Sequence, residues 1–300
     1  MSIAHGKEQK MNKLATVSST KTILDKYGFR LTKSLGQNFL VDNNILESII
    51  DSADLTGDDV VFEIGTGVGT LTRELSRHAK KVIAIEIDKK LIPILKETLS
   101  GCDNVTIINQ DILKTDIEDL VDQYGEGRPI KIVANLPYYI TTPIIMKFLE
   151  SHIKVDSFVL MVQKEVADRI AAKPSTKDYG SLTVAIQYYA DSSIMSTVPR
   201  SAFFPPPNVD SAVIKLSSRA ERPVDVVDEK LFFKVIRGSF SKRRKTILNS
   251  LSTYEDFNKE TVSKALKSAG IDPIRRGETL TIDEFALLTN SVAAEINSQS

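Results

Sequence analysis

Cysteine, histidine and tryptophan are scarce in this chain of 300 residues, which contains one cysteine, three histidines and no tryptophan. A single cysteine, Cys102, excludes an internal disulfide and any metal site built from several cysteines. The histidines His5, His78 and His152 are too scattered for a zinc site or a histidine-based catalytic triad. We therefore expect no metal centre, and the lone thiol fits a reducing compartment.

Long apolar runs and a net charge are also absent. No stretch approaches the roughly eighteen apolar residues of a membrane-spanning helix, and residues 1–20 lack the apolar core of a secretory signal. Basic and acidic residues number 39 each, so a nucleic-acid partner would have to be held by local basic patches. We expect a cytoplasmic protein without a membrane segment, in which residues 1–21 form a flexible leader.

Short β-branched segments alternate with helical patterns between residues 60 and 165. We expect strands at 59–64, 82–85, 105–108, 130–134 and 157–162, and helices at 70–79, 89–100, 112–124, from 141 or 142 onward, and at 164–172. Such alternation indicates βαβ units and a parallel sheet. Two further strands, at 182–189 and 212–216, have no helix between them and suggest an antiparallel pair at one edge. The proline-rich segment 199–207 fits neither regular structure.

After Arg219 only helical periodicity remains. The sequence therefore predicts an α/β fold with a Rossmann-like sheet and a small all-helical C-terminal domain. We expect the first domain to span residues 22–219 and the second to span residues 220–300.

The segment Asn135-Leu136-Pro137-Tyr138 follows the predicted strand at 130–134. Open α/β sheets bind ligands at the carboxyl ends of their strands, and the proline stiffens the turn. The Asn135 amide oxygen, the Leu136 carbonyl and the flat ring of Tyr138 suit the exocyclic amine of a planar base. We therefore expect an adenine amino group to be methylated here, with the two oxygens accepting its hydrogens.

A second candidate site follows the strand at 59–64. The residues Gly65-Thr66-Gly67-Val68-Gly69 have the spacing G-x-G-x-G, whereas a dinucleotide fingerprint needs G-x-G-x-x-G. Glu86 ends the next strand, where a carboxylate can accept ribose hydroxyls, and Asp111 follows the third, where it can accept an adenine amino proton. The spacing favours S-adenosylmethionine over NAD.

Five motifs occur in order along the chain: Lys33-Ser34-Leu35-Gly36-Gln37-Asn38-Phe39-Leu40, Glu63-Ile64-Gly65-Thr66-Gly67-Val68-Gly69, Asn135-Leu136-Pro137-Tyr138, Phe203-Phe204-Pro205-Pro206-Pro207-Asn208-Val209-Asp210-Ser211 and Phe240-Ser241-Lys242-Arg243-Arg244-Lys245-Thr246. Together they resemble those of the ribosomal RNA adenine dimethyltransferases, most closely the branch acting on the bacterial small subunit, and the resemblance covers about residues 22–294. One departure is Thr66, where many members carry proline.

The resemblance implies a Rossmann-like class I methyltransferase that converts S-adenosylmethionine to S-adenosylhomocysteine. Its substrate would be two adjacent adenines in the 3′-terminal hairpin loop of 16S rRNA, each dimethylated at N6 within an immature small subunit. We expect a monomer. The implied cofactor contacts are Asn38, Leu40, Gly65, Glu86, Asp111 and Asn135, and the implied surroundings of the target adenine are Asn135, Leu136, Tyr138 and Phe204.

A basic cluster in the C-terminal region, without an intervening acid, is the candidate RNA-binding surface. It consists of Arg237, Lys242, Arg243, Arg244 and Lys245, and Arg275-Arg276 adds to it. Beside an RNA-directed catalytic domain, contact with phosphates is the favoured interpretation.

Three alternatives remain open at this point. The chain could be a dimethyltransferase of large-subunit RNA that confers macrolide resistance, a non-catalytic ribosome-assembly or transcription factor, or an NAD dehydrogenase. The glycine spacing disfavours the last of these.

Overall fold

The computed structural model describes residues 14–32 and 35–298, and these fall into two compact units. The first unit is the chain up to Ala167 together with Ser193–Ser218, and the second is Asp168–Ser192 together with the chain from Arg219 onward. The predicted leader, residues 1–21, lies partly outside the described residues. Its last part is helical, because helix α2 (Val17–Lys26) begins at Val17 with the Thr16 side chain as its N-cap.

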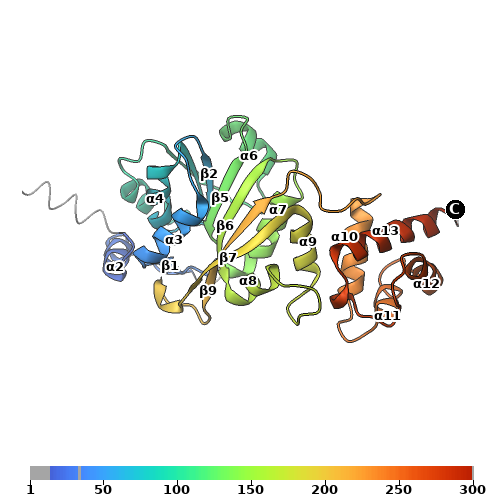
Figure 1. Ribbon diagram of the computed structural model, residues 1–300. Helices are drawn as coiled ribbons and strands as arrows, with labels where there is room; N and C mark the ends of the chain where they lie inside the picture. Colours follow the sequence, from blue (N-terminus) through green and yellow to red (C-terminus); the bar gives the residue numbers. More distant parts are fainter. Residues whose placement is uncertain (1–13, 33–34, 299–300) are drawn as a thin grey trace, which may run out of the picture. The chain divides into compact units, whose positions relative to one another are not determined.

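A sheet forms the centre of the first unit (Figure 1). It has seven strands in the order β4-β3-β2-β5-β6-β9-β7. The pairs β2–β3, β3–β4, β2–β5 and β5–β6 are parallel, and β6–β9 is antiparallel. The strands are β2 (Val60–Ile64), β3 (Lys81–Glu86), β4 (Val105–Asn109), β5 (Ile130–Asn135), β6 (Val155–Gln163), β7 (Ala190–Val198) and β9 (Ser211–Ser218). A separate antiparallel pair joins β1 (Phe39–Leu40) to β8 (Phe203–Phe204).

Apart from α2, the helices of this unit follow its strands, as the alternation predicts. They are α3 (Asn43–Ala53), α4 (Thr70–His78), α5 (Ile92–Thr98), α6 (Ile117–Tyr124), α7 (Thr141–Leu149) and α8 (Lys164–Ile170), which continues into the second unit. Apolar side chains of α3 and α4, such as Ile49 and Leu75, pack on Val61, Val133 and Val159 of the sheet. The parallel pairing of β2 with β5 brings the carboxyl ends of these two strands to the same edge of the sheet.

Among the described residues of the second unit, the regular structure is helical apart from the residues of β7 that the unit includes. Its elements are α9 (Ser181–Tyr189), α10 (Glu229–Phe240), α11 (Ile247–Leu251), α12 (Lys259–Ser268) and α13 (Ile282–Asn297). Polar side chains cap the last four helices, and α13 has a full capping box of Thr281 and Glu284. The predicted α/β class with a helical C-terminal region is therefore confirmed.

Several predicted elements were wrong. Residues 182–189 form helix α9 instead of a strand, and the edge strand is β7, which follows it. Helix α5 begins at Ile92 instead of residue 89, with Pro93 in its first turn, and α6 begins only after its cap Asp116. Neither Thr141 nor Thr142, the residues from which a cap of the next helix is expected, caps α7, which begins at Thr141 without a side-chain cap. The proline-rich segment contains the short strand β8.

Two absences apply to the described residues. None of their helices combines the length and apolar character needed to cross a bilayer. They also contain no cluster of three or more potential metal ligands.

Candidate functional site

The glycine turn after β2 lies where the strand order reverses, with β3 and β4 on one side of β2 and β5 and β6 on the other. Such a switch point leaves a crevice at the carboxyl ends of the strands. Gly65 and Gly67 have φ angles of 77° and 62°, and a Cβ on Gly67 would lie 3.1 Å from the Phe39 ring. Glycine is thus required by both conformation and space. The Thr66 hydroxyl donates to the Ile85 carbonyl at 3.2 Å, so its side chain fastens the turn to β3.

Glu86, the last residue of β3, is buried and organises the turn. Its Oε2 accepts the Gly67 N–H at 2.9 Å, and its Oε1 accepts the Asp88 N–H at 2.8 Å. Burial raises the pKa of the Glu86 carboxyl, and the two backbone N–H groups oppose that shift because they stabilise the anion. The side chain is therefore fixed at the edge of the crevice, with lone pairs remaining for a ligand hydroxyl.

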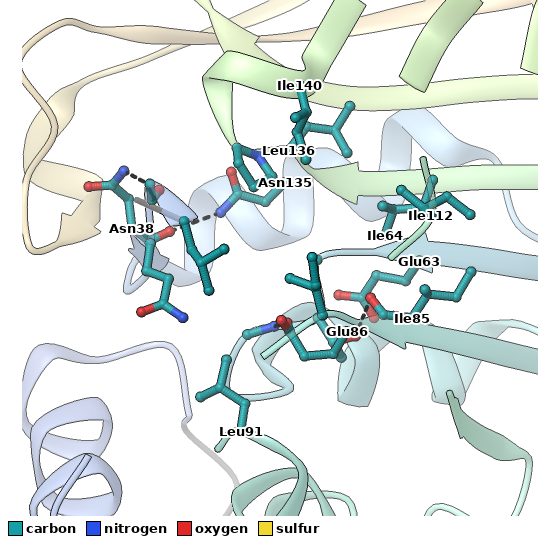
Figure 2. Close-up of a pocket in the computed structure, with 18 of the residues that line it drawn as sticks. Asn38, Glu63, Ile64, Ile85, Glu86, Leu91, Ile112, Asn135, Leu136 and Ile140 are labelled. Carbon is teal, nitrogen blue, oxygen red and sulfur yellow. Dashed lines mark hydrogen bonds between the residues drawn. The ribbon is translucent and has the colours of Figure 1, made fainter. Parts of the chain in front are cut away.

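The other predicted cofactor residues line the same cavity. Asp111 follows β4, and its Oδ1 accepts the Leu113 N–H at 3.1 Å. Asn38 and Leu40 enter from the segment around β1, where Leu40 is buried. Figure 2 shows Asn38, Glu86 and Asn135 around this cavity, and Gly65 and Asp111 also contribute to its wall.

Asn135, the last residue of β5, has its side chain oriented by one hydrogen bond. Its Nδ2 donates to the Asn38 carbonyl at 3.1 Å. Neither its Oδ1 nor the carbonyl oxygen of Leu136 accepts a hydrogen bond from any described residue. Two acceptors on consecutive residues that line the cavity are therefore without a hydrogen-bond donor among the described residues.

Tyr138 begins the short 3₁₀ helix Tyr138–Ile140 and also lines the cavity. Its hydroxyl is 2.7 Å from the Ser211 hydroxyl at the start of β9. Burial raises the pKa of the phenol, so it stays neutral at physiological pH. The ring is thus held in place by a polar contact at its far end.

Phe204 does not line the cavity. It pairs with Phe39 across β8 and β1 and packs on the cluster containing Leu24. The Lys21 ammonium lies 5.1 Å from the centre of its ring, a cation–π contact. The expected stacking of Phe204 on a base therefore stays a prediction.

Four residues of this region were not singled out from the sequence as ligand contacts: Gln37, Glu63, Asp88 and Tyr139. Gln37 donates to Asp88 at 2.8 Å, which joins the segment before β1 to the end of β3. Tyr139 is exposed at the rim, and Glu63 lies buried in the wall. Gln37 and Glu63 belong to the recognised motifs, which is the signal that could have identified them.

The predicted RNA-binding cluster belongs to the second unit. Arg237 lies on α10, and Lys242–Lys245 follow that helix. All five side chains are exposed. Arg243 also donates to the Lys177 carbonyl, which ties it to the loop before α9.

A largely parallel sheet with a glycine turn at its switch point and acids at the next two strand ends defines a Rossmann-like enzyme for a nucleoside-containing ligand. The family model described as ribosomal RNA adenine dimethylase matches residues 28–294. The chain belongs to this family, an assignment that confirms the resemblance seen in the motifs and excludes the dehydrogenase alternative.

Curated relatives cover nearly the whole chain. Ribosomal RNA small subunit methyltransferase A of Clostridioides difficile is 54% identical over 289 residues, which are 96% of this chain and 100% of that protein. The protein of the same name from Geobacillus thermodenitrificans is 55% identical over 283 residues, covering 93% of this chain and 97% of that protein.

Two solved structures are also similar. A dimethyladenosine transferase from Plasmodium falciparum has a TM-score of 0.69 at 29% identity, covering 87% of this chain and 98% of that one. The 23S rRNA methyltransferase ErmE has a TM-score of 0.64 at 28% identity, and the match covers 85% of this chain and 100% of that one.

Proposed function

We propose that this protein transfers methyl groups from S-adenosylmethionine to N6 of two adjacent adenines in the 3′-terminal hairpin loop of 16S rRNA, giving N6,N6-dimethyladenosine. The observation that carries the proposal is the pair of unoccupied acceptors, the Asn135 Oδ1 and the Leu136 carbonyl, beside the crevice at the switch point. An exocyclic amine is the group that two such acceptors fit, because it has two hydrogens to donate.

The cavity fits S-adenosylmethionine. Gly65 and Gly67 allow close approach of a ligand to the backbone, Glu86 would accept ribose hydroxyls, and Asp111 would accept an adenine amino proton. Asn38, Leu40 and Asn135 would complete the contacts. When bound, the cofactor supplies an electrophilic methyl group on a sulfonium.

The chain's own groups act on the nucleophile. The N6 lone pair of adenine is conjugated with the ring, and hydrogen bonds to the Asn135 and Leu136 oxygens help the nitrogen to pyramidalise and stabilise its developing positive charge. The Asn38 carbonyl fixes the Asn135 amide so that its oxygen is presented. Rate enhancement then comes from positioning and preorganised dipoles, without a strong base.

The target base must leave its stack to reach this site, and the Tyr138 ring would receive it. Tyr138→Ala should therefore lower kcat/KM for RNA by about 10- to 100-fold, since stacking contributes ~1–3 kcal/mol per base. Tyr138→Phe keeps the ring and loses only the contact with Ser211, so its loss should be a few-fold. Steady-state kinetics on unmethylated subunits measures both, and an equal loss in the two variants would contradict the stacking role.

The 53–55% identity to small-subunit enzymes, against 28% to ErmE, favours small-subunit RNA over large-subunit RNA. Incubation with labelled S-adenosylmethionine and unmethylated small subunits, followed by nucleoside analysis, tests the function. We expect dimethyladenosine in the small-subunit RNA and none in purified large subunits. The reverse result would favour the large-subunit alternative, and no transfer to either would favour a non-catalytic assembly factor.

The remaining expectations form part of the same proposal. The substrate is the immature small subunit, which places the protein in the cytoplasm, and the enzyme acts as a monomer. Residues 22–219 form the methyltransferase domain, and residues 220–300 contact RNA through the basic cluster.

Reversing two charges of the basic cluster tests whether residues 220–300 contact RNA. Arg243→Glu combined with Arg244→Glu should weaken RNA binding at least about tenfold and reduce its salt dependence, because phosphate contacts release counterions. S-adenosylmethionine binding should be unchanged. Filter binding measures the affinity for RNA, and calorimetry measures the affinity for S-adenosylmethionine.

Two further variants sharpen this test. Arg244→Glu with Lys245→Glu leaves the bond from Arg243 to the Lys177 carbonyl intact and should weaken RNA binding similarly. Lys259→Glu with Lys267→Glu, exposed positions of α12, is the matched charge control. Equal weakening by this control, or loss of cofactor binding, would defeat the assignment.

A further inference from the structure

Glu63, on β2, is a buried acid that the chemistry above does not use. Its side chain is 1% exposed and lies in the wall of the cavity (Figure 2). Its Oε2 accepts no hydrogen bond from any described residue. An unpaired charged carboxylate in such a place is strongly unfavourable, so its charge state depends on what else occupies the cavity.

The groups around Glu63 cannot neutralise a negative charge. Glu86 on β3 adds a like charge, and α4 presents only the buried, uncharged hydroxyls of Thr70 and Thr72. The described residues that line the cavity include three acids, Glu63, Glu86 and Asp111, and no lysine, arginine or histidine. The wall therefore favours a ligand that brings positive charge.

Burial raises the pKa of Glu63 to about 8, and the charge of Glu86 adds to the shift, while the Thr72 hydroxyl opposes it. Near neutral pH the side chain is thus mainly the neutral acid. A cation placed in the cavity would favour the ionised form.

We propose that Glu63 is the charge-selective residue of this cavity: it is a neutral acid without ligand and releases its proton to solvent when a sulfonium cation binds. The inference rests on the proposed function and deepens it. S-adenosylhomocysteine lacks the sulfonium charge, so Glu63 takes up a proton again once the methyl group has left. The cavity then holds the cofactor in preference to its product, and the overall reaction stays balanced because methylation of N6 itself releases one proton.

Calorimetry in buffers of different ionisation enthalpy tests this exchange. At pH 7 the wild-type protein should release up to about one proton more than Glu63→Gln on binding S-adenosylmethionine, because the free protein holds Glu63 mainly as the neutral acid. The difference removes the contribution of the cofactor's own amino group. When S-adenosylhomocysteine is bound instead, the difference in proton release between wild type and Glu63→Gln should be close to zero. Glu47→Gln, an exposed acid on α3, should behave as wild type.

The outcomes separate this inference from the function. Equal proton release by wild type and Glu63→Gln, with tight cofactor binding by both, would overturn the role of Glu63 and leave the function intact. Failure of the wild type to bind S-adenosylmethionine would overturn both. Should Glu63→Gln not fold, infrared difference spectra of the wild type decide: a protonated carboxyl band must disappear when S-adenosylmethionine is added.

Stability without ligand gives an independent measurement. Because the folded-state pKa is raised from 4.5 to about 8, the stability that Glu63 contributes is full below pH 4.5 and is lost as the pH rises to about 8. The Tm of the wild type should therefore fall relative to Glu63→Gln over this window. Parallel Tm profiles would show that Glu63 is ionised throughout.

Discussion

Asn135→Ala should slow methyl transfer by about 10²- to 10³-fold, the effect of removing one preorganised group that stabilises charge in a transition state. The variant lacks the oxygen that would accept a hydrogen from N6, and the Leu136 carbonyl alone cannot hold both hydrogens. Single-turnover rates with saturating S-adenosylmethionine and unmethylated small subunits report the chemical step directly. An unchanged rate would refute the proposed mechanism.

The same substitution also removes the hydrogen bond from Asn135 to the Asn38 carbonyl, so controls must separate the two losses. Asn135→Asp keeps a side-chain oxygen and loses the donor, and its rate should fall between those of wild type and Asn135→Ala. Asn44→Ala, at an exposed position of α3, is the matched control. Cofactor affinity, measured by calorimetry, shows how much the segment around Asn38 has loosened.

The parallel half of the sheet could be predicted because its strands are short, β-branched and separated by segments of helical periodicity. Helix α9 could not be predicted from the sequence. Six of its nine residues are buried, so it has neither the alternation of a strand nor the polar face of a surface helix, and a buried apolar run is ambiguous by periodicity. The edge strand β7 was missed for the opposite reason, because much of it is polar and exposed.

The residues of the candidate site that lie at strand ends could be predicted from the sequence, because the strands themselves could be recognised. Glu86 and Asn135 end recognisable strands and Asp111 follows one, and parallel topology brings the three residues to one edge. Phe204 was placed by its motif alone, and packing beside Phe39 positions it outside the cavity wall. The state of Glu63 depends on burial and on Glu86, which sequence spacing does not specify.

Glu86→Gln should weaken S-adenosylmethionine binding by roughly 10- to 100-fold, the effect of losing a hydrogen bond to a charged group. Both carboxylate oxygens accept backbone N–H groups, from Gly67 and Asp88. A glutamine amide has only one acceptor atom, so its NH₂ would face one of these donors. The glycine turn should then lose its fixed position, and the ribose would lose an anionic acceptor.

The affinity for the product, S-adenosylhomocysteine, distinguishes the role of Glu86 from that of Glu63. Cofactor and product share the ribose, so Glu86→Gln should weaken both to the same extent in calorimetry, with kcat at saturating cofactor little changed. Glu63→Gln should instead reduce the preference for S-adenosylmethionine over S-adenosylhomocysteine. Asp103→Asn, exposed before β4, is the charge control. If Glu86→Gln bound the cofactor as tightly as wild type, neither the ribose contact nor the organising role of this carboxylate could stand.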